Sequence, residues 1–402
     1  MVAVECRKMN QGILLMHLGR ESIPFPMKTN VSPKEIARLF FKLGVIGFGG
    51  PAAHIAMMQQ EVVVKRKWMS EQHFLDLLGA TNLIPGPNST EMAIHIGYDR
   101  AGWKGLLAAG LCFILPAVVI TGIFAWLYRQ YGQLPDVQPF LYGIKPAIIA
   151  VIIGAVYPLA KKSVKTVFLG SIGIAVLVAA LFGIHEIYLM FGAGLLALAW
   201  HSIQHRRTGQ LQCLLPLTVL EITPHALRSA ANAELFWIFL KIGAILYGSG
   251  YVLFAFLDTE LVAAGVLSRQ QLIDAIAVGQ FTPGPVFSSV TFIGYQINGL
   301  SGAFISTIAI FLPSFVFVAF LNPLMKKMRH SQGLSAFLDA VNVASVAIIA
   351  AVCFTMGKES IVDWRTTTIA LVSAVIVFGF RKINSAFIVS GGALLGYLLF
   401  QF

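Results

Sequence analysis

The chain carries few charged residues for its length. Asp, Glu, Lys and Arg make up 12% of its 402 residues, about half the share in a typical soluble domain. Hydrophobic residues make up 57%, the mean hydropathy is +0.78, and apolar runs such as 105–127, 140–159 and 167–182 recur. Because roughly 20 apolar residues span a bilayer as a helix, we predict a polytopic all-α membrane protein.

Cysteine and the signatures of catalysis are equally scarce. The four cysteines, Cys6, Cys112, Cys213 and Cys353, show no C-x-x-C spacing, so we predict neither a disulfide framework nor a metal site. The chain has no G-x-x-x-x-G-K-[ST] motif to bind the nucleotide of a primary pump and no H-E-x-x-H motif. We expect no cofactor and no enzymatic activity. Any transport would be driven by an ion gradient or by exchange, or would be uncoupled.

The net charge of +11 does not indicate a nucleic-acid partner. The basic residues lie mainly in short clusters between apolar segments, namely Lys65-Arg66-Lys67, Lys161-Lys162, Arg206-Arg207, Lys326-Lys327 and Arg381-Lys382. Such clusters set the orientation of membrane helices, whereas nucleic-acid binding needs a basic stripe on a folded domain. The lipid bilayer is the expected surroundings.

One short motif occurs twice in the middle of apolar segments. Pro85-Gly86-Pro87 in the first half returns as Pro283-Gly284-Pro285 in the second. Proline removes a backbone donor and clashes with the preceding turn, so each motif should break its helix. Within a membrane, broken helices are tolerated only where protein or a water-filled cavity satisfies the freed backbone. Matching breaks in two halves are the best sequence pointer to a transporter binding site.

The two motifs belong to a longer internal repeat. Phe40–Gly44 matches Phe239–Gly243, Ser70 and Asp76 match Ser268 and Asp274, and Leu115-Pro116 matches Leu312-Pro313. The offset drifts only from 199 to 197, so the series indicates a true repeat. We predict a flexible arm over 1–32, membrane repeat 1 over 33–203, a linker over 204–232 and membrane repeat 2 over 233–402.

Local signals refine the first repeat. Ser32, Pro33 and Glu35 predict a helix start, with Ser32 as the N-cap. A cluster of glycines, ending at Gly49 and Gly50, predicts a further helix break. The segment that contains Pro85-Gly86-Pro87, about 74–97, is expected to form a re-entrant hairpin.

Loop charges indicate that the two repeats are inverted. In the first half the basic loops follow the segments that end near 64, 97, 160 and 203. In the second half they follow the segments that end near 325 and 380, and the other loops are neutral or acidic. Equivalent loops that differ in this way, one basic and the other neutral or acidic, lie on opposite sides of the membrane. We therefore predict inverted-topology repeats with about ten crossings, both termini outside and the linker inside.

A helix that begins at a break presents unsatisfied N–H groups and the positive end of its dipole, which favour anions. Lysines inside membrane segments also tend to face a pathway. The predicted substrate-binding residues are Lys42, Gly49, Gly50, His54, Pro85, Gly86, Pro87, Asn88, Ser89, Thr90, Lys145, Lys241, Pro283, Gly284, Pro285, Ser288 and Ser289. Glu91 and His95 are candidates for proton coupling.

Several of these residues also allow a structural interpretation. Lys42 and Lys241 can snorkel towards an interface. Glu91 stands three residues after Asn88, which is the spacing of a capping box. His95 can support the helix locally through Glu91 at i, i+4.

The first half resembles the chromate ion transporter (CHR) family. The resemblance rests on Phe41-Lys42-Leu43-Gly44, Phe48-Gly49-Gly50-Pro51-Ala52-Ala53-His54, Trp68, Phe74, Pro85-Gly86-Pro87, Gly97-Tyr98 and Gly102. It extends in degraded form over about 35–400, where Gly248-Ser249-Gly250-Tyr251-Val252-Leu253 replaces the histidine motif, so a second histidine site is not expected.

This resemblance implies a two-domain chromate transport protein with inverted repeats in the bacterial cytoplasmic (inner) membrane. It implies a secondary transporter that exports chromate, or the similar oxyanion sulfate, and confers chromate resistance. A homodimer is a candidate assembly. The alternatives are an anion channel, a transporter of another small anion, or an intramembrane enzyme with a metal held by His54, Glu61, Glu91 and His95.

Overall fold

A computed structural model describes residues 31–48, 50–204, 232–248, 250–328, 331–380 and 383–400. This part of the chain forms fourteen α-helices and no strand. Five helices are long and apolar enough to cross a membrane, and three shorter helices are also apolar. The predicted all-α polytopic fold is confirmed. Gly49, nearly all of the predicted arm and nearly all of the linker lie outside the described residues.

The helices of the two repeats follow one another in the same order. Repeat 1 contains α2 (Pro33–Ile46), α3 (Gly50–Gln59), the π-helical η1 (Gln60–Lys65), α4 (Glu71–Thr81), α5 (Asn88–Tyr131), α6 (Gln138–Ser163), α7 (Val167–Leu181) and α8 (Glu186–Gln204). Repeat 2 contains α9 (Asn232–Ile245), α10 (Val252–Leu257), the π-helical η2 (Asp258–Val262), α11 (Arg269–Phe281), the 3-10 turn η3 (Val286–Ser288), α12 (Ser289–Met328), α13 (Gln332–Ser360), α14 (Trp364–Gly379) and α15 (Ser385–Phe400).

The start of α2 and the break after it are as predicted. Ser32 is the N-cap, its hydroxyl accepts a hydrogen bond from the backbone N–H of Glu35 at 3.2 Å, and Pro33 opens the helix. The helix ends at Ile46 with Gly47 as its C-cap, and α3 begins at Gly50 with a φ of +79°. Glycine adopts this left-handed conformation without the steric cost that a Cβ would add. The glycine cluster therefore separates α2 from α3.

Helix α5 reverses direction within its own span. Ala101 and Gly102 leave helical geometry, and Gly102 has a φ of +56°. A Cβ at Gly97 would overlap the carbonyl oxygen of Gly105, although the two residues are eight positions apart. Eight residues of straight helix would separate them by about 12 Å, so residues 88–100 and 103–131 are the two arms of a hairpin. Helix α12 repeats this device at Asn298 and Gly299.

The equivalent helices α6 and α13 are antiparallel. Lys165, just after the end of α6, pairs with Asp339 near the start of α13 at 2.7 Å. Tyr142, near the start of α6, donates to Asp363, which follows the end of α13. At each end of the pair, a residue at one end of α6 contacts a residue at the other end of α13. Such an exchange is what a two-fold axis perpendicular to the two helices produces. The repeats are thus inverted with respect to each other.

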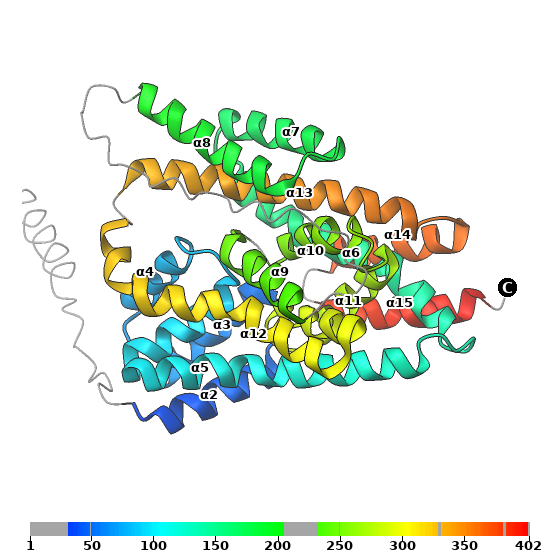
Figure 1. Cartoon of the computed structure of the whole chain (residues 1–402), viewed down its shortest axis with the longest axis horizontal. Helices are drawn as coiled ribbons and strands as arrows, with labels where there is room; N and C mark the ends of the chain where they lie inside the picture. The colour runs from blue at the N-terminus through cyan, green and yellow to red at the C-terminus, as the bar shows by residue number, and fades with distance from the viewer. Residues whose placement is uncertain are drawn as a thin grey trace, which may run out of the picture.

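The outer faces of the hairpins are apolar and exposed at a spacing of four residues. The exposed positions on α5 are Trp103, Leu107, Leu111, Leu115, Val119 and Ile123, and those on α12 are Leu300, Phe304, Ile308, Leu312, Val316 and Phe320. Phe304 is 69% exposed. A soluble protein rarely exposes so large an apolar stripe, whereas lipid covers it at no cost. Helix α13 lies beside α7 and α8 along the long axis of the molecule (Figure 1).

We predict that Gly97→Val disrupts the fold of repeat 1. The new side chain meets the backbone of Gly105 rather than a flexible side chain, so the cost should reach about 3 kcal/mol or more. Thermal unfolding of the purified protein in detergent would show a lower midpoint or a loss of monodisperse protein. Gly122→Ala is the control, because an added Cβ there has no atom within 4 Å. Equal stability of the two variants would contradict the hairpin.

Candidate functional site

The two Pro-Gly-Pro turns each bind the helix break of the opposite repeat. The backbone N–H of Gly86 donates to the carbonyl oxygen of Leu246 at 2.8 Å, and that of Gly284 donates to the carbonyl oxygen of Gly47 at 2.7 Å. Leu246 and Gly47 occupy equivalent positions, with an offset of 199. The four breaks therefore meet in two reciprocal contacts, which satisfy backbone groups that lipid cannot.

Both turns require glycine at their centre. Gly86 has a φ of +133° and Gly284 a φ of +93°. A Cβ at Gly86 would also overlap the carboxylate of Glu91 and the hydroxyl of Ser314. The turn thus packs directly against the buried carboxyl group of Glu91. A change in the charge of Glu91 would therefore occur next to the contact between the repeats.

A cavity of about 390 Å³, lined by both polar and apolar side chains, opens beside the first turn. Its walls come from α4, the start of α5, the end of α6 and the first half of α13. The residues that line it are Gly79, Asn82, Leu83, Asn88, Leu159, Lys162, Ser163, Lys165, Gly248, Ser331, Ser335, Leu338, Asp339, Asn342, Ser345, Val346 and Ile349. Both repeats contribute, so the cavity lies at the repeat interface.

The inner end of the cavity presents hydrogen-bond donors. Helix α5 begins at Asn88, and Pro87 at its N-cap supplies no side-chain cap. The Asn88 amide donates to Asn82 at 3.2 Å and reaches the carbonyl oxygen of Gly248 only at 3.5 Å. Asn342 and Ser345 face the same space from α13. Amides and an open helix N-terminus are donors suited to an oxyanion.

The mouth of the cavity is basic. Lys162 and Lys165 line it at the end of α6. Lys165 is paired with Asp339 at 2.7 Å, whereas Lys162 has no ion-pair partner within the described ranges. A lysine at the mouth raises the local concentration of anions.

The residues predicted at the glycine break support it rather than line the cavity. His54 is 1% exposed, its Nε2 lies 2.8 Å from the carbonyl oxygen of Gly47, and its ring packs edge-on against Phe113. Gly50 begins α3 at the same break. These contacts fix the backbone that receives Gly284.

The predicted pair Lys42 and Lys241 does not reach the cavity. Lys42 binds Glu61 at 3.1 Å and Lys241 binds Glu260 at 2.5 Å, each with the same separation of 19 residues. At the basic loop beside Lys65, outside the spanning helices, burial tends to raise the pKa of Glu61. The hydrogen bonds from Lys65 and Lys42 outweigh that effect and lower the pKa. The repeated lysines therefore form repeated ion pairs.

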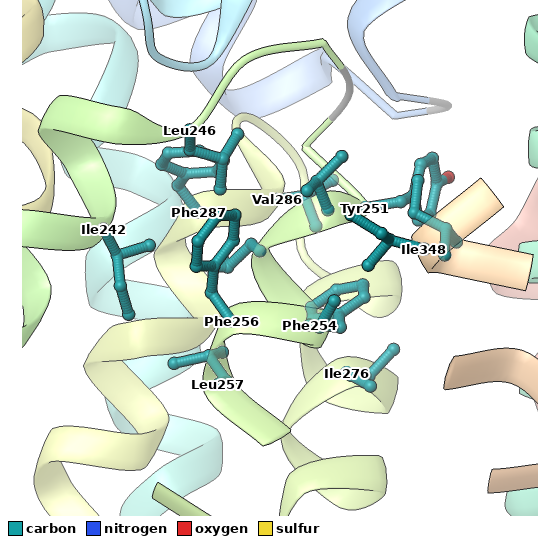
Figure 2. Close-up of a cluster of buried hydrophobic side chains, with 14 of the residues drawn as sticks. Ile242, Leu246, Tyr251, Phe254, Phe256, Leu257, Ile276, Val286, Phe287 and Ile348 are labelled. Atoms are coloured by element: carbon teal, nitrogen blue, oxygen red, sulfur yellow. The ribbon is translucent and has the colours of Figure 1, made fainter. Parts of the chain in front are cut away.

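The donors predicted at the second break are sealed from solvent. Ser288 and Ser289 are fully buried. Thr121 donates to Ser288 at 3.3 Å, and Ser289 donates to its own helix turn at Val286. Val286 stands where the first repeat has Asn88, and it joins an apolar cluster with Phe254, Phe256, Phe287, Tyr251 and Ile348 (Figure 2). The structure is open at the first turn and closed at the second.

Glu91 is buried without forming the capping box that its spacing allowed. Its Oε1 accepts from the hydroxyl of Ser314 at 3.4 Å, and its Oε2 has no hydrogen-bond partner in the described part of the chain. The N-cap is Pro87 and not Asn88, so the capping-box alternative is wrong. His95 is 1% exposed, and neither ring nitrogen is hydrogen-bonded to a described residue. Ser89 and Thr90 lie buried beside them.

Sequence reasoning missed Asn82, Asn342 and Ser345. Asn342 stands at the position equivalent to Lys145, with an offset of 197. Polar side chains in an apolar helix were the available signal. Lys162 was assigned to membrane orientation alone, yet it also borders the cavity.

Comparison with known proteins gives one consistent result. A family model described as Chromate transporter matches residues 34–198 and 233–397. A chromate transport protein of Cupriavidus metallidurans is 31% identical over 383 residues, which cover 91% of this chain and 93% of that protein. A probable chromate transport protein of Synechococcus elongatus is 31% identical over 356 residues, with 86% and 89% covered. A chromate transport protein of Pseudomonas aeruginosa is 28% identical over 400 residues, with 94% of each chain covered. No solved structure matches.

We predict that single cysteines report the open and closed sides. In a background without native cysteines, Asn342→Cys should react quickly with a membrane-impermeant thiol reagent applied at the side of Lys162, because Asn342 lines the cavity. Val286→Cys should react slowly from either side, because Val286 is 6% exposed in the apolar cluster. Labelling after denaturation is the control for total thiol. Equal rates for both variants would refute this asymmetry.

Proposed function

The chain belongs to the chromate transporter family, and from this premise we propose that it is a secondary transporter that exports chromate, or the similar oxyanion sulfate, across a bacterial cytoplasmic membrane. Export of chromate would confer chromate resistance. The observation that carries the proposal is the cavity that leads from Lys162 and Lys165 to the uncapped start of α5 at the contact between the repeats.

The chemistry of the cavity suits a tetrahedral dianion. Such an anion only accepts hydrogen bonds, and the side-chain amides of Asn82, Asn88 and Asn342, which line the cavity, are donors of the kind it needs. Lys162 supplies positive charge to the lining, because the charge of Lys165 is compensated by Asp339. Chromate and sulfate share charge and shape, so donors of this kind should separate them only weakly.

We infer the orientation of the cavity in the membrane from the charge of the loops. Basic loops stay on the cytoplasmic side, and Lys161, Lys162 and Lys165 belong to one of them. The cavity would then open to the cytoplasm, with the linker inside and both termini outside. An exporter in this state is ready to receive its substrate.

The closed second turn favours a transporter over a channel. A channel needs a continuous path, whereas Val286 and Phe287 at the second turn are buried in an apolar cluster. Transport would require the two reciprocal backbone contacts to rearrange, so that the sides open in turn. We propose Glu91 and His95 as proton carriers at the first turn, because both are buried and Glu91 touches Gly86.

We expect purified protein in proteoliposomes to move chromate, with sulfate in excess as a competitor. Asn88→Ala and Asn342→Ala should each raise the half-saturating chromate concentration about 10- to 100-fold, because a hydrogen bond to a charged group contributes about 1.5–3 kcal/mol. Thr355→Ala is the matched control on α13, since its hydroxyl bonds only its own helix at Ala351. A normal response in both asparagine variants would move the anion site elsewhere, and absence of chromate flux in the unaltered protein would refute the function.

Lys162→Gln should slow chromate entry by a few-fold at low salt, because a charge at the mouth acts by long-range attraction. The difference should disappear at high salt, where charges are screened. Flux measured at several ionic strengths tests this. Lys358→Gln is the control, because Lys358 lies over the ring of Phe354 at the far end of α13. A loss that salt does not change would assign Lys162 a direct or structural role instead.

A further inference from the structure

One acidic side chain lines the cavity, although the other polar groups there favour an anion. Among the described residues of the lining, Lys162, Lys165 and Asp339 are charged, and Asp339 is the carboxylate. Its Oδ1 accepts a hydrogen bond from the Nζ of Lys165 at 2.7 Å. A carboxylate repels an anion that comes near it. The presence of Asp339 in this lining therefore calls for a role of its own.

Asp339 lies between the mouth of the cavity and the amide of Asn342. Helix α13 presents Ser335, Asp339, Asn342 and Ser345 to the cavity, at the spacing of three or four residues that places side chains on one face of a helix. Asn342 is about one turn further from the start of α13 than Asp339 is. An anion that moves from the mouth to Asn342 therefore passes the pair that Lys165 forms with Asp339.

The pair is accessible to water and can exchange partners. The side chain of Lys165 is 55% exposed and that of Asp339 is 29% exposed. Exposed ion pairs contribute little to stability, because water and salt screen them. The ammonium group of a lysine is a compact charge on a flexible stem. Lys165 can therefore leave Asp339 for another anion at little cost.

The fold does not require an ion pair at this place. The offset of 197 that relates α6 to α13 puts Tyr142 at the position of Asp339, and Lys145 at that of Asn342. Lys145 is half-buried, and neither Tyr142 nor Lys145 lines the cavity. Tyr142 donates to Asp363 and so joins α6 to α13 at the closed end. A neutral hydroxyl holds the helices together there, whereas the open end uses a lysine and a carboxylate.

We propose that Asp339 sets the affinity of the open side by competing with the oxyanion for Lys165. The inference rests on the proposed transport function and adds to it the residue that limits how tightly the anion is held. On entry the anion takes Lys165 from Asp339, and when the anion leaves, Asp339 binds Lys165 again. Lys165 exchanges one negative partner for another and is not left unpaired. This exchange works in either direction of transport and with any coupling ion.

The test is the initial rate of chromate transport in proteoliposomes, with chromate applied at the side of Lys162. Asp339→Ala removes the competitor, so the half-saturating chromate concentration should fall about two- to fivefold, which is the competition that an exposed ion pair offers. The maximal rate should fall by a similar factor, because the anion is held more tightly before it moves and the later steps are unchanged. Asp339→Asn removes the same charge with less change of shape and should act in the same way. Asp339→Glu keeps a carboxylate and should transport like the unaltered protein.

Two further variants separate competition from other roles of Asp339. In a Lys165→Gln background, Asp339→Ala should leave the half-saturating concentration nearly unchanged, because the lysine for which the two anions compete is gone. Tyr142→Phe removes the equivalent contact between α6 and α13 at the closed end, and it should not lower the half-saturating concentration.

Two results would overturn this inference in a protein that transports chromate. One is an unchanged or higher half-saturating concentration in both Asp339→Ala and Asp339→Asn. The other is a fall of the same size with and without Lys165, which would show that Asp339 acts on the anion only through its long-range charge. Absence of chromate transport in the unaltered protein would instead overturn the proposed function.

Discussion

The structure depends on one constraint, which is that every backbone polar group at membrane depth needs a partner. Breaking helices at Pro85-Gly86-Pro87 and Pro283-Gly284-Pro285 frees such groups, and each repeat supplies what the other lacks. Gly86 donates to Leu246, and Gly284 donates to Gly47. Each of these contacts joins one repeat to the other. The helix breaks therefore depend on the pairing of the two repeats. The cavity lies where this junction leaves the start of α5 without a side-chain cap.

A symmetric backbone here carries an asymmetric set of side chains. The hairpin glycines, the lysine–glutamate pairs and the lipid-facing stripes recur in both repeats. At the junction itself the repeats differ: Asn88 faces a cavity where Val286 is buried, and Asn342 stands where the other side has Lys145. The two repeats thus share their backbone geometry, whereas the side chains at the two ends of the junction differ in chemistry.

Much of the fold could be predicted from the sequence, because its signals are local or repeated. Apolar length predicted the membrane class, Ser32 and Pro33 predicted the start of α2, and the repeat register predicted which breaks are equivalent. The site was predicted less well. Asn88 was found because it follows a break, but Lys42 and Lys241 are bound to glutamates that are 19 residues away in sequence. Asn342 and Ser345 reach the cavity from a helix of the other repeat, and no local pattern contains that information.

The exchanged hydrogen bonds also bear on how such a protein could have arisen. A chain with a single repeat would leave the donor of its Pro-Gly-Pro turn and the acceptor of its glycine break without partners. A second copy inserted in the opposite orientation in the same membrane satisfies both, as the two exchanged hydrogen bonds do here. The fused chain, with its 199-residue offset between Gly47 and Leu246, fixes that opposite orientation permanently. Fusion also allows the side chains of each half to change independently. Asn88 and Val286, which occupy equivalent positions, differ in this way.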